Sequence, residues 1–366
     1  MKIALLDPFH TGSHAQWSTG YAARSTHEVR IFSLPGRHWK WRMHGGAVAL
    51  AEAFLSSGFQ ADLLLATDML DLGAFLALTR RQTHNIPTAL YFHENQLTYP
   101  WSPTDADVAL QRDNHYAFIN YSSALAADAC FFNSPYHKNS FLEALPGFLK
   151  GFPDRRGMDN VRRIGEKSQV LDLALDLKGL EVGEQNDRPV LLWNHRWEYD
   201  KGPEEFFEGL LELAEEGVEF EVVVLGEGYG RVPEVFAEAK EKLGSRVLHW
   251  GYAESKSAYA QWLAKGDVLP VTSRQDFFGG SVVEAMAAGC VPLLPRRLNY
   301  PSLIPESAHK TCLYESGNFK NALRHLLQND TWRDISPSPW VAHFDWTQLA
   351  PLYDRRFNEL CTPNSN

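Results

Sequence analysis

Two carboxylates stand eight residues apart across a glycine turn in the segment DFFGGSVVEAMAAGC, residues 276–290. Glycine lets the backbone approach a ligand closely, and the helix that follows the turn begins with free N–H groups that can bind an anion. Asp276 can accept hydrogen bonds from sugar hydroxyls, and Glu284 can hold the vicinal diol of a ribose. The backbone expected to contact such a ligand belongs to Phe278, Gly279 and Gly280. The alternative is an ordinary strand-to-helix connection in which Glu284 is only solvated.

Two cations lie in the segment NHRWEYDKG, residues 194–202, which follows a predicted strand. A departing diphosphate needs positive charge where its negative charge develops, and Arg196 and Lys201 can supply that charge. Turns follow the next two predicted strands: Gly226 allows another close approach, and Tyr252 stands where the backbone can present groups to a nucleotide base. The alternative for both cations is surface pairing with the neighbouring carboxylates of the same segment.

The N-terminal half has a polar strand end of its own, in the segment YFHENQLTYP. Polar and ionisable groups crowded at one strand end are typical of functional sites, so His93, Glu94 and Asn95 are candidates for the acceptor side, with His93 contacting the transferred sugar. The alternative is a structural histidine that binds the loop backbone and pairs with Glu94. After the first strand, Gly12 and Ser13 either let the loop approach the diphosphate or form a plain tight turn.

Aromatic and cationic side chains alternate in the segment RHWKWR, a composition suited to stacking on nucleic-acid bases. Trp39, Trp41 and Arg42 are therefore further candidates for the acceptor side. A second basic segment, residues 150–167, is better interpreted as a solvated charged face. The net charge of −10 lies entirely in residues 173–366, because basic and acidic side chains balance before that point. Since acidic surfaces repel nucleic acid, a polyanion is expected to dock on the N-terminal half.

Bulk properties exclude several classes of protein. The N-terminal apolar run ends at Asp7 and predicts a buried strand rather than a signal peptide. No apolar run approaches the length needed to cross a bilayer. The four cysteines are scattered without paired spacing, which indicates free thiols in a reducing, cytoplasmic compartment. The histidines show no zinc-ligand spacing, and the acidic pair at residues 105–107 caps a helix more simply than it binds a metal.

Short apolar strands alternate with longer amphipathic segments, which indicates βαβ units and parallel sheets covered on both faces. The predicted strands are 2–7, 28–33, 62–67, 88–93, 129–133, 189–194, 219–226, 246–251, 267–272 and 291–295. The predicted helices include 46–57, 106–127, 203–216, 231–242, 255–264 and 281–288. The pattern predicts two doubly wound α/β domains, 1–172 and 189–344, joined by a linker at 173–188, and a final helix within 345–366 that can cross back to the first domain. Ligands bind such sheets at the carboxyl ends of the strands, where the polar candidates fall.

Several of these patterns together resemble the nucleotide-sugar domain of retaining GT-B glycosyltransferases. They are the arginine and Lys-Gly after the domain's first strand, Gly-x-Gly after its second, and an acidic-x7-Glu element followed by AMAAG. One departure is that the first acidic position is usually Glu and here is Asp276. The N-terminal patterns GSH (12–14), WKWR (39–42), YFHENQLTYP (91–100) and FNS (132–134), with HRWE (195–198) and DFFG (276–279), resemble the tRNA-queuosine α-mannosyltransferase family. This resemblance runs from the first strand to about Pro301.

The resemblance implies a GT-B fold whose two Rossmann-like domains face a cleft. It implies GDP-mannose as the donor, queuosine in the anticodon loop of a tRNA as the acceptor, and retention of configuration at the anomeric carbon. It also implies that no metal ion or other cofactor is needed and that no membrane is involved. The residues predicted to be catalytic are His93, Arg196, Lys201 and Asp276. Two alternatives stay open: a GT-B enzyme with a saccharide or lipid-linked acceptor, and a non-catalytic protein that binds tRNA.

Overall fold

The computed structural model describes residues 1–366 except 102–104, 106, 108–109, 111–113, 229–231 and 363–366. Contacts divide the chain into two compact units, with Met1–Asp176 and Trp346–Asn366 in unit 1 and Leu177–Asp345 in unit 2. The final helix thus belongs to unit 1, and the segment expected to be a linker is shared between the units. Several residues in the N-terminal part of the helix predicted at 106–127 lie outside the described residues, including Ala106 between the two aspartates.

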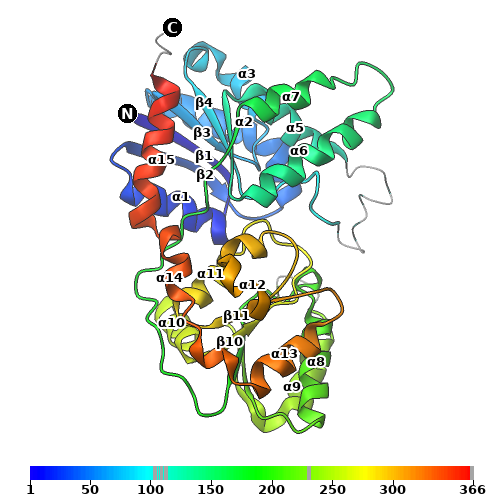
Figure 1. Ribbon diagram of the computed structural model, residues 1–366. Helices are drawn as coiled ribbons and strands as arrows, with labels where there is room; N and C mark the ends of the chain where they lie inside the picture. The colour runs from blue at the N-terminus through cyan, green and yellow to red at the C-terminus, as the bar shows by residue number, and fades with distance from the viewer. Residues whose placement is uncertain (102–104, 106, 108–109, 111–113, 229–231, 363–366) are drawn as a thin grey trace. The chain divides into compact units, whose positions relative to one another are not determined.

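Unit 1 is built on a six-stranded parallel sheet in the order β2-β1-β3-β4-β5-β6. Its strands are β1 (Lys2–His10), β2 (Glu28–Pro35), β3 (Leu63–Thr67), β4 (Thr88–Phe92), β5 (Ala129–Phe132) and β6 (Ser168–Val170). Its helices are α1 (Gly12–Arg24), α2 (Trp39–Ser57), α3 (Leu72–Thr83), α5 (Asn114–Ala126), α6 (Pro135–Lys150), α7 (Asp159–Glu166) and α15 (Trp346–Cys361). Every residue of β3 and β4 is buried, because helices cover both faces of the sheet (Figure 1).

Unit 2 has a second six-stranded parallel sheet, in the order β12-β11-β10-β7-β8-β9. Its strands are β7 (Val190–Trp193), β8 (Glu221–Leu225), β9 (Val247–Gly251), β10 (Val268–Pro270), β11 (Val291–Pro295) and β12 (Leu313–Tyr314). Its helices are α8 (Pro203–Glu215), α9 (Val235–Leu243), α10 (Lys256–Lys265), α11 (Gly280–Ala287), α12 (His309–Cys312), α13 (Phe319–Gln328) and α14 (Ser338–Val341). Short 3-10 turns include η1 (Tyr199–Lys201) and η3 (Tyr300–Leu303).

The predicted α/β class with two doubly wound parallel sheets is confirmed, and each strand predicted from an apolar run is present. The sequence missed β6 and β12, which have three and two residues. Both lie at a sheet edge, where a strand needs only one partner and no long apolar run. In unit 2 the strand order reverses between β7 and β10, and this reversal is the switch point at which such sheets bind ligands.

The last helix, α15, is held to α1 within unit 1 by aromatic rings and one buried hydroxyl. The Tyr353 hydroxyl accepts a hydrogen bond from Trp17 Nε1 at 3.1 Å and donates to the backbone oxygen of Asp172 at 2.7 Å. Gly20 makes the approach possible, since a Cβ added there would lie 2.4 Å from the Trp346 indole nitrogen. The C-terminal segment therefore completes the N-terminal unit.

A buried carboxylate also fastens α15. The side chain of Asp354 accepts hydrogen bonds from the Tyr21 hydroxyl at 2.9 Å, the Ser25 hydroxyl at 2.6 Å, and the Thr26 backbone N–H and hydroxyl at 2.8 and 2.6 Å. Burial by itself would raise the pKa of Asp354, but the hydrogen bonds from Ser25 and Thr26 outweigh burial and hold the pKa below its usual value. The carboxylate is thus the form that the fold stabilises.

We expect Asp354→Asn to lower the free energy of unfolding by about 1–3 kcal/mol at pH 7, because an amide cannot accept all of these hydrogen bonds. A folded-state pKa below the unfolded value contributes stability above the unfolded pKa, and this contribution is lost as the pH falls through the folded pKa. The difference between wild type and variant should therefore shrink between about pH 4 and pH 2. Urea denaturation across this range measures it, with Glu359→Gln on the exposed side of α15 as the control; a difference that stays constant with pH would contradict the assignment.

Candidate active site

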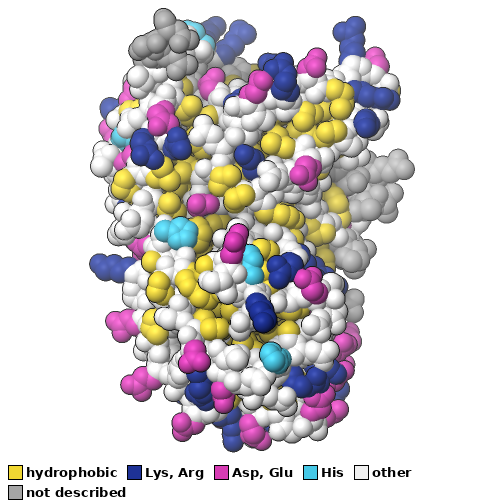
Figure 2. Space-filling view, viewed as in Figure 1, with side chains coloured by type: hydrophobic (Ala, Val, Ile, Leu, Met, Phe, Trp, Pro, Cys, Tyr) yellow, Lys and Arg dark blue, Asp and Glu magenta, His cyan; other side chains and the backbone are white. Residues whose placement is uncertain are grey.

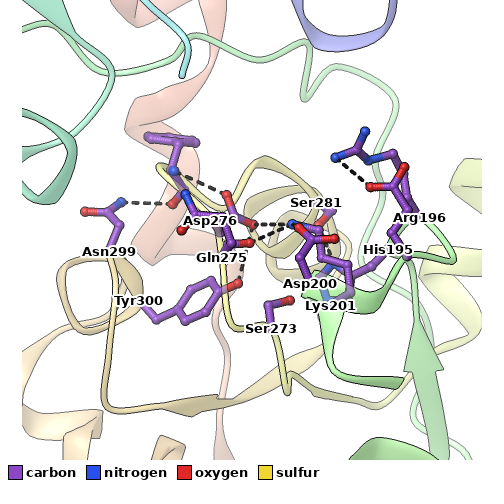
Figure 3. A network of polar contacts seen from close by, with 12 residues as sticks. His195, Arg196, Asp200, Lys201, Ser273, Gln275, Asp276, Ser281, Asn299 and Tyr300 are labelled. Carbon is purple, nitrogen blue, oxygen red and sulfur yellow. Dashed lines mark hydrogen bonds and ion pairs between the residues drawn. The ribbon is translucent and has the colours of Figure 1, made fainter. Parts of the chain in front are cut away.

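The switch point of the unit 2 sheet gathers the predicted donor-side residues at one edge. Strands β7 and β10 pair directly, and β8 lies on the other side of β7. Loops that follow neighbouring parallel strands leave the sheet at the same carboxyl edge. The segment 194–202 after β7, Gly226 after β8, and the segment 271–280 after β10 therefore lie along this edge, and Figure 3 shows polar contacts between the first and the last of them.

Lys201 ties the loop after β7 to the loop after β10. Its side chain is only 11% exposed, and its Nζ donates to the backbone oxygen of Gln275 at 2.8 Å. The same nitrogen lies 3.3 Å from the carboxylate of Asp200 and 3.9 Å from that of Asp276 (Figure 3). The sequence predicts a cation facing a ligand, whereas the structure surrounds this ammonium with two carboxylates. Since the Asp276 contact is too long for a hydrogen bond, one of the three N–H donors can still turn to a phosphate oxygen.

Asp276 shapes the turn that leads into α11. Its Oδ1 accepts a hydrogen bond from the backbone N–H of Phe278 at 3.3 Å, and its Oδ2 accepts one from the Tyr300 hydroxyl at 3.4 Å. The side chain is 19% exposed, so a hydroxyl group can still reach it. The shorter carboxylate at this position therefore has a local structural role, and its predicted contact with the sugar stays a prediction.

The turn ends in an uncapped helix start. Gly279 has a φ of 101° and is the N-cap of α11, where it has no side chain to bind the first N–H groups of the helix. A Cβ at Gly279 would lie 3.0 Å from the side chain of Leu303. The Phe278 ring is buried and lies 5.1 Å from that of Phe344, so only its backbone can meet a ligand. The helix that begins at Gly280 thus offers an anion site of the predicted kind.

Glu284 lies one turn into α11. Its Oε2 accepts a hydrogen bond from the hydroxyl of Tyr259 at 2.9 Å. Burial raises the pKa of Glu284, and this hydrogen bond acts in the opposite direction. Tyr259 is a residue that the sequence did not single out, because nothing in its helical segment distinguishes it from a packing aromatic. It holds one carboxylate oxygen and so orients the other.

The sequence assigned no role to His195. This residue belongs to the loop after β7, and the structure places its ring against the first turn of α11. His195 is 3% exposed, and its Nδ1 lies 2.9 Å from the hydroxyl oxygen of Ser281 in the first turn of α11 (Figure 3). Burial, and then the nearby charge of Lys201, lower the pKa of His195 to about 3, so the ring is neutral at pH 7. Its Nε2 is buried and has no hydrogen-bond partner within the described part of the chain.

Three other predicted donor-side residues differ in how firmly they are held. Gly226 has a φ of 111°, and a Cβ there would lie 2.5 Å from the backbone oxygen of His195, so only glycine fits. The half-exposed guanidinium of Arg196 lies 3.2 Å from the carboxylate of Glu198, a surface pair of small net energy that can exchange for a phosphate. Tyr252 is 63% exposed after β9.

His93 follows β4 at the carboxyl edge of the unit 1 sheet. Its backbone N–H donates to Asp68 Oδ1 at 2.8 Å, and its ring centre lies 4.3 Å from that of His14 and 4.8 Å from that of Trp17. Burial, and then the nearby imidazole of His14, lower the pKa of His93 well below its usual value. His93 is therefore a neutral hydrogen-bonding group at pH 7 and not a cation.

The residues after His93 organise their own loop. Glu94 accepts a hydrogen bond from the Gln96 side chain at 2.9 Å. Asn95 is fully buried, and its Oδ1 accepts hydrogen bonds from the backbone N–H groups of Leu97 and Thr98 at 3.1 and 2.9 Å. This amide oxygen therefore closes a turn, and the predicted place of Asn95 on the acceptor side stays a prediction.

The first loop of unit 1 leads into α1. Gly12 has a φ of 50° and starts the helix, and Ser13 follows it; both residues are exposed. The positive φ explains why a glycine stands at this turn. Both residues belong to unit 1, and their predicted contact with the diphosphate stays a prediction.

The predicted aromatic and basic segment lies at the start of α2. Trp39 packs against the rings of Tyr116 and Trp101, with centres 5.0 and 6.1 Å away, and Arg42 donates to the backbone oxygen of Pro35 at 3.1 Å. Trp41 differs from both, because it is 63% exposed and its ring lies over Gly45, where a Cβ would be 2.6 Å away. Trp41 is thus an ordered aromatic surface suited to a base.

Charge on unit 2 is mixed. Figure 2 shows basic side chains of this unit scattered among acidic ones on the face in view. The acidic excess of the chain belongs to residues 173–366, most of which form this unit. A nucleic acid would therefore meet less repulsion on unit 1.

Other features lie away from these strand ends. A cavity of unit 2 is lined in part by Asp267, Gly289 and Trp332. It lies at the amino-terminal edge of the sheet, because Asp267 directly precedes β10 and Gly289 lies two residues before β11. Among the described residues, no three His, Cys, Asp or Glu side chains are arranged to hold a metal ion. Over the same residues, every helix is too short or too polar to span a bilayer. The four cysteines are free thiols, as predicted.

Comparison with known proteins decides the family. A sequence model described as the N-terminal part of tRNA-queuosine alpha-mannosyltransferase matches residues 2–175, and one described as glycosyl transferases group 1 matches residues 188–329. A Drosophila melanogaster protein named tRNA-queuosine alpha-mannosyltransferase is 34% identical over 339 residues, which cover 89% of this chain and 86% of that protein. This chain belongs to the tRNA-queuosine alpha-mannosyltransferase family. The resemblance deduced from the sequence is thereby confirmed.

Solved structures confirm the fold of this family member. Sucrose-phosphate synthase from Thermosynechococcus elongatus superposes with a TM-score of 0.73 at 17% identity, over 98% of this chain and 99% of that one. HepE from Anabaena, solved with UDP, gives 0.68 at 14% identity, over 98% of this chain and all of that one. At such low identity the similarity concerns the fold alone, and it establishes the predicted GT-B class. The tRNA-queuosine alpha-mannosyltransferase family member is a GT-B glycosyltransferase.

Two glycines with positive φ allow the close approach at β8 to be tested. Gly226 and Gly217 have φ values of 111° and 80°, but only Gly226 has an atom within 4 Å of an added Cβ, the His195 backbone oxygen at 2.5 Å. We expect Gly226→Ala to destabilise the protein by about 2–4 kcal/mol and Gly217→Ala by about 1 kcal/mol, because both variants carry backbone strain and only the first adds a clash. Thermal denaturation measures both. Equal losses of stability in the two variants would show that the His195 oxygen does not exclude a Cβ at position 226.

Proposed function

We propose that this protein transfers mannose from GDP-mannose to queuosine in the anticodon loop of tRNA, with retention of configuration. The observation that carries the proposal is the 34% identity with a named tRNA-queuosine alpha-mannosyltransferase over 89% of the chain. The geometry at the switch point of unit 2 supports a nucleotide-sugar donor there. The low charge of unit 1 and the exposed ring of Trp41 support an RNA acceptor.

On the donor side, negative charge develops on the diphosphate as its bond to the anomeric carbon breaks. The first N–H groups of α11, the Lys201 ammonium and the Arg196 guanidinium lie along one sheet edge, where they can stabilise that charge. Glu284 holds the ribose diol through the oxygen that Tyr259 leaves available. These groups neutralise the leaving group with side chains and a helix end, so the proposed mechanism uses no metal ion and no cofactor.

At the reacting centre, a hydroxyl of the queuosine cyclopentene-diol attacks the anomeric carbon from the face that GDP leaves. The carbon–oxygen bond to the diphosphate breaks, the bond to the acceptor oxygen forms, and the acceptor proton passes to a phosphate oxygen of the leaving GDP. Asp276 is engaged in its own turn and Glu284 with Tyr259, so neither serves as a covalent nucleophile. Neutral His93 contacts the transferred sugar by hydrogen bonding.

The proposal is tested by incubating the purified protein with GDP-mannose and queuosine-containing tRNA. Nucleosides released by digestion should gain the mass of one hexose at queuosine, and tRNA that lacks queuosine should stay unmodified. Treatment with EDTA should leave the rate unchanged if no metal takes part. Unmodified queuosine after long incubation, with GDP-mannose intact, would refute the proposed reaction.

The two alternatives make different predictions in simple assays. A GT-B enzyme with a saccharide or lipid-linked acceptor would hydrolyse or transfer the sugar without any dependence on tRNA. A non-catalytic tRNA-binding protein would gain no thermal stability from GDP, UDP or ADP sugars, because a ligand stabilises only a protein that binds it. Stabilisation by GDP-mannose alone would identify the donor.

Paired variants separate the donor side from the acceptor side. We expect Glu284→Gln to weaken GDP-mannose binding by about 10-fold or more while leaving tRNA affinity intact, because a neutral amide loses charge-assisted hydrogen bonds to the ribose. Trp41→Ala should do the reverse and weaken tRNA binding by about 5- to 100-fold, the range of one lost base stack. Isothermal titration with GDP-mannose and filter binding with tRNA measure the two affinities.

Phe118→Ala is the matched control for the loss of an exposed aromatic ring, since Phe118 is 45% exposed on α5 of the same unit. It should leave both affinities unchanged. If Trp41→Ala and Phe118→Ala weaken tRNA binding equally, the exposed ring of Trp41 has no specific role. If Glu284→Gln leaves the affinity for GDP-mannose unchanged, the ribose assignment fails.

A further inference from the structure

We propose that His195 contacts the donor directly, with its Nε2–H donating a hydrogen bond to an oxygen of the nucleotide-sugar diphosphate. The inference rests on the proposed function for the presence of a nucleotide diphosphate at this edge of unit 2. His195 would thus add a neutral hydrogen-bond donor to the two cations and the helix start. Nothing in the segment NHRWEYDKG predicts this role from the sequence alone.

Contacts on two sides hold the His195 ring in position. His195 lies two residues after the end of β7, and its ring packs edge-on against Trp193 with centres 5.4 Å apart. On the other side its Nδ1 lies 2.9 Å from the hydroxyl oxygen of Ser281 (Figure 3). The backbone oxygen of Ser281 accepts from the Asn194 side chain at 2.7 Å. The ring is therefore fixed beside the uncapped start of α11, where the anion is expected.

The Ser281 contact is compatible with the tautomer that the proposal requires. A serine hydroxyl that donates to Nδ1 leaves the ring proton on Nε2, which is then a hydrogen-bond donor. This Nε2 is buried on a residue only 3% exposed, and none of the described atoms accepts from it. A buried N–H without an acceptor is costly, so the site is complete only when an acceptor enters.

The charges around the ring leave a bound anion dependent on neutral donors. Lys201 is shared by the carboxylates of Asp200 and Asp276, so these three groups together carry a net negative charge. Arg196 is paired with Glu198. Net charge therefore stabilises a diphosphate here less than the presence of two cations suggests. N–H groups that donate to the diphosphate oxygens are correspondingly more important.

Other polar atoms of the two loops at the switch point are also unsatisfied. The Asn194 Oδ1 and Gln275 Nε2 atoms are buried and, like His195 Nε2, find no hydrogen-bond partner in the described chain. Buried polar atoms without a partner in these loops are typical of a region that binds a ligand or ordered water. Water at His195 Nε2 is the competing explanation, and it makes a different prediction for nucleotide affinity.

The test compares GDP binding by wild type, His195→Phe and His195→Gln using isothermal titration of the full chain. Phenylalanine keeps the ring packing and removes the donor, whereas the glutamine amide places an N–H near the position of Nε2. We expect His195→Phe to weaken GDP binding on the order of 10- to 100-fold, as for the loss of a hydrogen bond to a charged group. His195→Gln should recover most of the loss, and His325→Phe on the surface of unit 2 should have no effect.

Each outcome decides between the hypotheses. If wild type does not bind GDP, the proposed donor is wrong and the inference falls with it. If wild type binds GDP and His195→Phe binds it equally well, Nε2 is served by water and only this inference is overturned. Should His195→Phe fail to fold, the Nε2–H proton resonance of 15N-labelled wild type gives the answer: a shift on GDP addition supports the contact, and an unchanged resonance overturns it.

Discussion

The bond from the Lys201 ammonium to the Gln275 backbone oxygen, 2.8 Å long, joins two loops that are far apart in sequence and neighbours at the switch point. Around it, the backbone N–H of Arg274 donates to the backbone oxygen of Asp200 at 2.7 Å, and the Thr272 hydroxyl donates to the backbone oxygen of Gly202 at 2.8 Å. These contacts fix the loop after β7 against the loop after β10. The start of α11 and the imidazole of His195 take their positions from that junction.

This junction explains why a lysine used for structure can still serve a diphosphate. Burying an ammonium is costly unless it is paired, and Asp200, 2% exposed, supplies the compensating charge. The pairing removes much of the positive field that the sequence suggests, so the anion site depends on direct hydrogen bonds more than on net charge. In the proposed donor site, such an arrangement would select the shape and oxygens of a diphosphate over any nearby polyanion, which suits a member of a family that modifies tRNA.

The sequence predicted the architecture because the fold is set by local patterns: apolar strands, amphipathic helices and glycine turns. It also placed the strand ends correctly, because loops after adjacent parallel strands must share one edge. It could not predict pairings across loops. Lys201 and Asp276 both looked like ligand-facing groups, and their proximity to each other and to Asp200 depends on three-dimensional packing. The sequence likewise did not predict that the side-chain oxygen of Asn95 accepts hydrogen bonds from the backbone of its own loop.

The strand ends of the two units differ in the chemistry that they can perform. In unit 1, burial and then the nearby Glu94 raise the pKa of Asp68 well above its usual value, while burial lowers the pKa of His93. Both shifts favour the uncharged form of these two groups, so His93 is a neutral hydrogen-bonding group at this edge. Neutral groups bind hydroxyls without attracting phosphate, whereas the unit 2 edge combines a helix start with cations. The proposed transfer from a diphosphate to a hydroxyl would use one surface of each kind.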